Sequence, residues 1–116
     1  MKTSSAKAKG RFLQKLVVSK ILNLFPNLTN RQVKSTPMGC KGDDVQLSEE
    51  AAKLFPFSIE CKCQESLSIW AALKQAEGDN RDLTPLLVFK RNRSEVYCAL
   101  KFEDFMRIIS EHKECD

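Results

Sequence analysis

The sequence lacks long apolar runs, a disulfide-like cysteine pattern and a set of zinc ligands. It contains no apolar run near the roughly 20 residues needed to span a bilayer, and we expect no secretory signal before it. Its five cysteines are an odd number at irregular spacing, which favours a reducing, cytoplasmic setting over a disulfide framework. Cys61 and Cys63 have no second ligand pair, and His112 is the only histidine, so a zinc site is not expected.

Acidic residues are absent from the first 42 positions, which contain nine Lys or Arg, although the net charge of the whole chain is only +4. Such a one-signed block is typical of a surface that meets polyphosphate. A solubilising basic tail and an anionic membrane surface are the alternatives. Candidate phosphate contacts precede the first helix and cover a predicted hairpin tip, although each could equally be an ordinary solvated residue: Lys7, Lys9, Arg11, Lys90, Arg91 and Arg93.

The 116 residues suffice for one compact core, so we expect a flexible basic segment over 1–10 and a single domain over 11–116. Periodicity and turn residues predict helices from about 11 to 24, at 49–54, at 66–77 and at 102–111. Strands are predicted at 31–35, 42–47, 57–63, 86–89 and 95–100. This order describes a mixed sheet flanked by helices, in the α/β or α+β class.

Glu60 and Lys62 lie on one face of the predicted strand 57–63, two residues apart, whereas Cys61 and Cys63 lie on the other and are expected to pack as small apolar groups. A carboxylate beside an ammonium can serve as metal ligand and electrophile, or as base and phosphate contact. The same pattern is also common on a solvated strand face as a surface ion pair.

Asp44 stands at the head of another predicted strand, sixteen residues before Glu60. If the two strands are neighbours, both carboxylates and a backbone carbonyl at Cys61 could bind Mg²⁺ or Mn²⁺, which prefer oxygen ligands. The metal would activate a water for phosphodiester hydrolysis, and Lys62 would orient that water or the phosphate. Asp43 and Asp44 could alternatively be turn residues only.

Gly42-Asp43-Asp44-Val45 and Ile59-Glu60-Cys61-Lys62 together resemble the two halves of the PD-(D/E)xK nuclease signature. The helix that carries Gln75, the strand 85–89 and the helix that opens at Lys9-Gly10 further resemble small phage-encoded Holliday-junction-resolvase-like members. The resemblance covers about residues 9 to 109.

This resemblance implies a restriction-endonuclease-like core, cleavage of DNA with a divalent metal, and a homodimer. It assigns metal binding to Asp44 and Glu60, catalysis to Lys62 and a supporting role to Gln75. The substrate would be DNA, including branched DNA, in the cytoplasm of a bacterial host.

The sequence departs from the resolvase pattern near the predicted site. Asp43 replaces the proline of the family's Pro-Asp pair, which leaves open which aspartate binds metal. Gln14 stands where resolvases often have a glutamate, and a neutral amide is a poorer ligand. Ser35 occupies the place of an active-site serine in resolvases, so both residues are candidate contacts to nucleic acid or the site.

The sequence is therefore compatible with two functions. The first is a metal-dependent DNA endonuclease, which the carboxylate and lysine set favours. The second is a non-catalytic nucleic-acid-binding module of the same fold, which the basic N-terminal third alone would explain.

Trp70 could stack on a base, but its helical position beside Leu67 and Leu73 favours the core.

Overall fold

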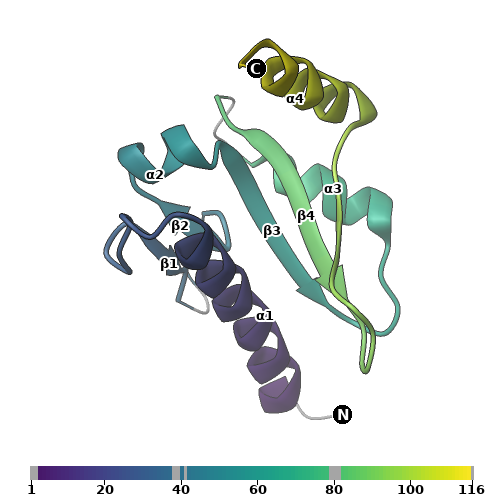
Figure 1. Ribbon diagram of the computed structural model, residues 1–116. Helices are drawn as coiled ribbons and strands as arrows, with labels where there is room; N and C mark the ends of the chain where they lie inside the picture. Colours follow the sequence, from purple (N-terminus) through teal and green to yellow (C-terminus); the bar gives the residue numbers. More distant parts are fainter. Residues whose placement is uncertain (1–2, 38–39, 41, 79–81, 116) are drawn as a thin grey trace.

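The computed structural model describes residues 3–37, 40, 42–78 and 82–115, with the backbone only at 3–4 and 114–115. Four helices and five strands occur in this part of the chain (Figure 1). In chain order they are α1 (Thr3–Leu24), β1 (Val33–Ser35), β2 (Val45–Leu47), α2 (Glu49–Leu54), β3 (Phe57–Cys63), α3 (Ile69–Glu77), β4 (Thr84–Lys90), β5 (Tyr97–Ala99) and α4 (Phe102–Cys115).

The strands form two sheets that meet at β3. β1 and β2 pair antiparallel, while β3 pairs parallel with β4, and β4 pairs antiparallel with β5. A parallel pair needs a crossover connection, which α3 provides. Asp44, the residue directly before β2, is hydrogen-bonded to β3: its N–H donates to the Ile59 carbonyl at 3.1 Å. This bond brings the free edge of β3 beside the start of β2.

The core lies between α1 and one face of the sheet. Leu13 and Ile21 of α1 are buried against a cluster that includes Ile59 and Cys61 of β3 and Val33 of β1. α3 lies on the other side of β3 and β4, where the small side chains Ala72 and Ala76 allow close packing (Figure 1). The face of β3 that carries Glu60 and Lys62 is therefore the α3 side.

Most predicted elements are confirmed, including the mixed α/β class and the extent of β3, with Ile59 and Cys61 in the core as expected. The first helix begins at Thr3 rather than near Arg11, so the expected boundary at residue 10 falls inside α1. α3 begins at Ile69, after Ser68, whose Oγ accepts from the Ala71 N–H at 3.3 Å. None of the described helices combines the length and apolar character needed to cross a bilayer.

Trp70 is not in the core, contrary to the sequence-based expectation, because 83% of the residue is exposed. α3 turns Ala72 toward the sheet, and two residues correspond to more than half a helical turn. Trp70 therefore lies on the opposite face of the helix, in solvent.

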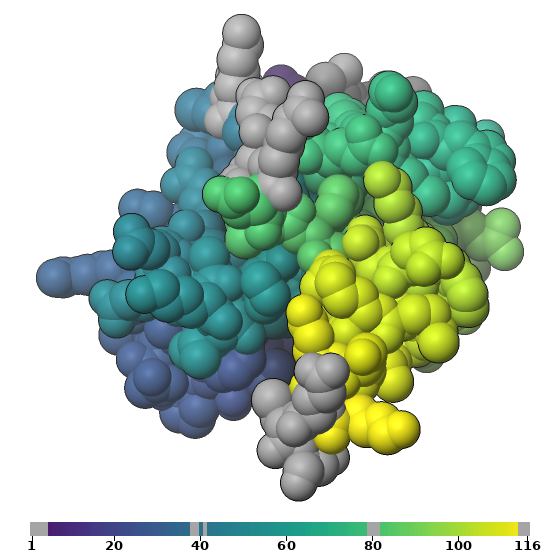
Figure 2. Space-filling model, turned by 90° about the horizontal axis from the view of Figure 1, so that it is seen from above, coloured from purple at the N-terminus to yellow at the C-terminus, as the bar shows by residue number. Residues whose placement is uncertain are grey.

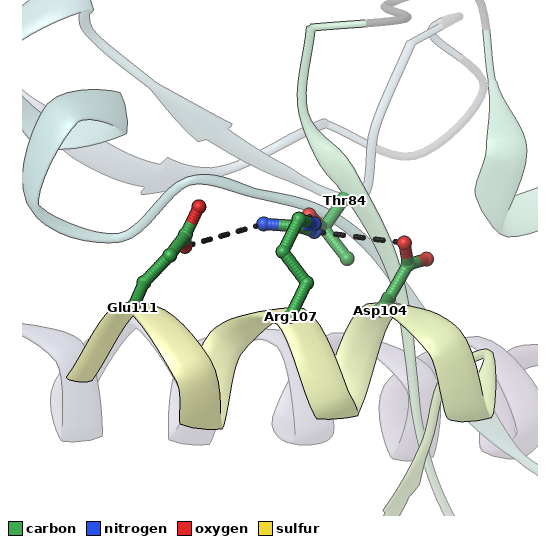
Figure 3. A network of polar contacts seen from close by, with 4 residues as sticks. All are labelled: Thr84, Asp104, Arg107 and Glu111. Carbon is green, nitrogen blue, oxygen red and sulfur yellow. Dashed lines mark hydrogen bonds and ion pairs between the residues drawn. The ribbon is translucent and has the colours of Figure 1, made fainter. Parts of the chain in front are cut away.

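α4 lies at the end of the sheet where β3 and β4 begin, and in the view from above its yellow side chains occupy one side of the surface (Figures 1 and 2). Its polar side faces the sheet: Arg107 donates to Thr84 Oγ1 at 2.7 Å and pairs with Asp104 and Glu111 (Figure 3). Its apolar stripe is between 45% and 70% exposed and consists of Phe102, Phe105, Met106 and Ile109. The helix thus presents apolar side chains outward.

Candidate active site

Asp44 is held between β1 and β3 by its backbone. The Thr36 N–H donates to the Asp44 carbonyl at 2.9 Å, the Thr36 hydroxyl donates to the Asp43 carbonyl, and the Asp44 N–H donates to Ile59. The Asp44 carboxylate then accepts from the Cys61 N–H, with Oδ2 at 2.7 Å from the nitrogen. Because Cys61 stands between Glu60 and Lys62, this bond fixes the Asp44 carboxylate beside the Glu-x-Lys motif.

Glu60 and Lys62 project from the same face of β3 and form an ion pair, with Lys62 Nζ 3.5 Å from Glu60 Oε2. Their side chains are only 12% and 22% exposed, respectively, so this pair is unlike an ordinary solvated one. The sequence left open whether these residues belong to a surface pair. The structure instead brings both beside Asp44 at the junction of β2 and β3.

The electrostatics of the three residues are coupled. The pKa of Glu60 is raised to about 7, chiefly because burial disfavours the carboxylate and also because the charge of Asp44 lies nearby. Burial also raises the pKa of Asp44, against the opposing effects of the Cys61 N–H and the Lys62 ammonium. Burial raises the pKa of the Cys61 thiol as well, so this cysteine stays a protonated core residue. Because the carboxylates of Asp44 and Glu60 are close together and partly buried, their site favours a bound cation.

Asp43 takes a different place from Asp44. Its Oδ1 lies 3.0 Å from the hydroxyl of Ser58, which also lies 3.1 Å from the Ala76 carbonyl of α3. Gly78 ends α3 with a φ of 53°, and a Cβ there would stand 3.2 Å from the same Asp43 oxygen. Asp43 therefore ties the loop before β2 to α3, whereas Asp44 joins Glu60 and Lys62.

Thr36, Ser58 and Gly78 are the residues around the site that sequence reasoning missed. Thr36 and Ser58 are buried, at 5% and 1% exposure, and both hold the Asp43-Asp44 segment. A hydroxyl at a buried strand position, as at Ser58, was the available signal. Its partner could not be read from the chain, because Asp43 is fifteen residues away.

The other residues predicted around the site come from three elements. Gln14 of α1 is 7% exposed, and its Oε1 has no hydrogen-bond partner among the described residues. Ser35 is half-buried at the end of β1, opposite Val45 in the register, and Gln75 is exposed on α3. Their functional roles stay predictions.

The two basic segments predicted to contact phosphate lie together. Lys9 of α1 shares a groove with Lys90 at the end of β4 and Arg93 in the β4–β5 turn. Lys7 and Arg11 are exposed on the same stretch of α1, and Arg91 is exposed in the same turn. Figure 1 shows the start of α1 and the β4–β5 turn at the same end of the molecule, opposite to α4.

The donor set fits a hard divalent cation better than zinc. Among the described residues no three His, Cys, Asp or Glu side chains gather into a metal-binding group. Asp44 and Glu60 offer two carboxylates, with the backbone at Cys61 next to them. Mg²⁺ is commonly bound by one or two carboxylates together with water and substrate phosphate, so two are sufficient.

Comparison with known proteins agrees with this geometry. Residues 26–115 match the model of a family described as "phage putative PDDEXK endonuclease". The chain belongs to this family. The restriction-endonuclease-like fold class and the resemblance to phage PD-(D/E)xK nucleases are thereby confirmed. No curated protein and no solved structure matches the chain significantly.

The match to the phage PDDEXK endonuclease family covers Asp44, Glu60 and Lys62 but not α1, since it begins after that helix. The three residues of the motif thus lie in the part of the chain that the family shares. The basic groove, in contrast, is built partly from α1, which stands outside the matched region.

Proposed function

We propose that this member of the phage PDDEXK family is an endonuclease that hydrolyses DNA phosphodiester bonds with Mg²⁺ or Mn²⁺. The observation that supports this most is the meeting of Asp44 with Glu60 and Lys62 at a half-buried junction of two strands. Carboxylates with raised pKa values beside a specific charge partner are typical of reaction centres. The resemblance to PD-(D/E)xK nucleases assigns the same three residues.

The residues divide the chemistry between them. Asp44 and Glu60 would hold the metal, with the Cys61 carbonyl as a further oxygen ligand. A bound divalent ion lowers the pKa of water and offsets negative charge on the phosphate. Lys62 favours the ionised form of Glu60 by pairing with it, against the effect of burial, and its ammonium can donate to a phosphate oxygen or to the attacking water. The nearby backbone bonds hold Asp44 in place during the reaction.

A cleavage assay with purified protein, DNA and Mg²⁺ or Mn²⁺ tests this function. Glu60→Gln should abolish cutting, and Lys62→Ala should slow it about 100- to 1000-fold, while the fold and most DNA affinity remain. The exposed pair of Glu77 and Lys101, 3.8 Å apart, supplies matched controls, and Glu77→Gln and Lys101→Ala should cut normally. DNA binding without metal-dependent cutting would instead indicate the non-catalytic binding module.

We further propose branched DNA, including four-way junctions, as the preferred substrate. The support is the resemblance to resolvase-like members and the concentration of positive charge at one end of the molecule. Competition between four-way, flap, duplex and single-stranded DNA at equal salt measures the preference. Equal cleavage of plain duplex would remove this part of the proposal.

The free state of Cys40, Cys61, Cys63 and Cys98 agrees with action in the reducing cytoplasm of a host cell.

We propose that the protein acts as a homodimer through α4. The outward apolar stripe of this helix is the support, since a monomer seldom leaves such a contiguous patch in water. Light scattering across a concentration series should show a dimer for the wild type and a monomer for Met106→Glu. Trp70→Glu, at an exposed aromatic on α3, is the control and should remain a dimer. A wild type that stays monomeric at all concentrations would contradict this proposal without affecting the active site.

A further inference from the structure

A groove on the α1 side of the sheet reaches Cys63, the last residue of β3, which directly follows Lys62 of the proposed active site. It encloses a volume of about 340 Å³ between the N-terminal half of α1, the end of β3 and the β4–β5 turn. The side chains that matter here are Lys9, Phe12, Cys63, Lys90 and Arg93. The volume lies at the small end of the range for pockets that hold a small organic group, and it is too small for a duplex.

Phe12 is the unusual member of this groove. It is 63% exposed, although the next residue, Leu13, is completely buried. The core of the protein therefore does not use Phe12, and α1 presents its ring to solvent among cationic side chains. An exposed aromatic ring bordered by Lys and Arg is the combination that binds an unstacked base together with its phosphates.

The charge of the groove has a single sign. Lys9, Lys90 and Arg93 line it, and none of the described residues that line it is acidic. Lys9 comes from α1, about 80 residues before the other two in the chain. The fold thus brings together cations whose mutual repulsion a polyanion would relieve.

The turn that carries Arg93 is held in position by several bonds. The Asn92 N–H donates to the carboxylate of Glu65, and the Arg91 N–H donates to Ser94 Oγ at 3.0 Å. Arg93 has a φ of 63°, a left-handed conformation that favours glycine. Arginine costs more than glycine in this conformation, which makes its side chain a candidate for a role in the groove.

We propose that this groove binds an unpaired segment of the DNA substrate, with one base stacked on Phe12 and the adjoining phosphates on Lys9, Lys90 and Arg93. This rests on the proposed nuclease function and adds the part of the substrate that the protein recognises. An unpaired strand is required because bases in a duplex stack on one another and offer no free face to Phe12.

The position of the groove connects it to the reaction centre. Cys63 at its edge directly follows Lys62, and consecutive strand residues project from opposite faces of a sheet. A DNA strand that runs from the groove to Glu60 must therefore pass from one face of the sheet to the other. A flexible single strand can make this passage, whereas a duplex is stiff over such a length.

Fluorescence anisotropy of a labelled single strand of about 12 nucleotides, and of the matching duplex, tests the proposal in buffer with EDTA. Phe12→Ala should weaken single-strand binding roughly five- to a hundredfold and duplex binding less than about twofold. Phe12→Trp should retain the affinity, because it keeps a ring to stack on. Trp70→Ala, which removes another exposed aromatic, should have no effect.

The substitution Arg93→Gly tests the side chain of Arg93 separately from the backbone conformation of the turn. It should weaken single-strand binding without lowering the melting temperature, because glycine suits the left-handed turn. Arg31→Ala, the loss of an exposed charge elsewhere, should change the affinity much less. An equal loss for Arg31→Ala and Arg93→Gly, or an equal loss of duplex and single-strand binding in Phe12→Ala, would overturn the proposal. Because no cleavage is measured, these outcomes are independent of whether the protein is a nuclease.

Discussion

Asp43 and Asp44 are adjacent in the chain and identical in chemistry, yet the structure gives them different partners. Asp44 accepts from the Cys61 N–H beside Glu60, and Asp43 meets Ser58 beside α3. The sequence left open which aspartate would bind metal, because both stand where the motif allows one. Different bonds to β3 separate them: Asp43 is held at Ser58, near the start of the strand, whereas Asp44 is held at Cys61, directly between Glu60 and Lys62.

The substitutions Asp43→Asn and Asp44→Asn form a matched pair that tests this difference. Asp44→Asn should abolish detectable cleavage, because an amide replaces a carboxylate ligand. Asp43→Asn should retain roughly one to ten per cent of the wild-type rate, since a residue that acts only through its neighbours typically costs about 10- to 100-fold. Initial rates of DNA cleavage at saturating Mg²⁺ measure both. Equal inactivation by both substitutions would mean that Asp43 takes a direct part.

Glu60 gives the metal-free protein a pH-dependent stability. Its pKa is about 7 in the folded state and near 4.5 in the unfolded chain, so the folded state binds more protons between these values. Stability should therefore fall as the pH rises from about 4.5 through about 7, and the raised pKa of Asp44 acts in the same direction. Thermal melting in EDTA at pH 5 and pH 8 measures this loss. Glu60→Gln should show a smaller difference, and an unchanged difference would contradict the assignment.

At the scale of elements, β3 was the most predictable part of the molecule and α4 the least. The alternation in Phe57–Cys63 correctly indicated both the strand and its two faces, because a strand exposes its period of two directly in the sequence. The amphipathic pattern of α4 correctly indicated a helix with one apolar face. It contained no information on the direction of that face, which the bond between Arg107 and Thr84 turns outward.

Arg107→Ala should loosen α4 without unfolding the protein. The bond from Arg107 to Thr84 fixes the polar side of the helix to β4, while its partners Asp104 and Glu111 lie on α4 itself. We expect faster hydrogen exchange in α4, little change in β3, and a loss of about 0.5–1.5 kcal/mol in local stability. Lys113→Ala, in the last turn of the same helix, is the control and should leave exchange unchanged. Protection of α4 that survives Arg107→Ala would show that other contacts hold it.

At the scale of the whole molecule, the site is a junction of elements that are distant in sequence. β1 and β3 hold the backbone around Asp44, β3 carries Glu60 and Lys62, and α3 adds the Ala76 carbonyl near Ser58. A metal that binds this junction binds only the folded state, so it should stabilise the protein as a whole.

Addition of Mn²⁺ to the metal-free protein should raise its melting temperature. At a free concentration about 100 times the Kd, the gain is about 2.7 kcal/mol. Glu60→Gln should lose most of this gain, and Glu77→Gln, an exposed glutamate paired with Lys101, should keep it. Differential scanning calorimetry measures the shift. A gain that Glu60→Gln retains in full would place the metal elsewhere.

The order of helices and strands, the faces of β3 and the identity of the acidic and basic candidates were determined by the sequence, because periodicity, turn residues and charge are local properties. The tertiary structure alone decided that Asp44 rather than Asp43 joins Glu60, that Trp70 is exposed, and that Lys9 and Phe12 line one groove with Arg93. These outcomes depend on which surfaces pack together over long separations in the chain. Packing of that kind is set by the shape and burial of the whole core, which no short stretch of sequence contains.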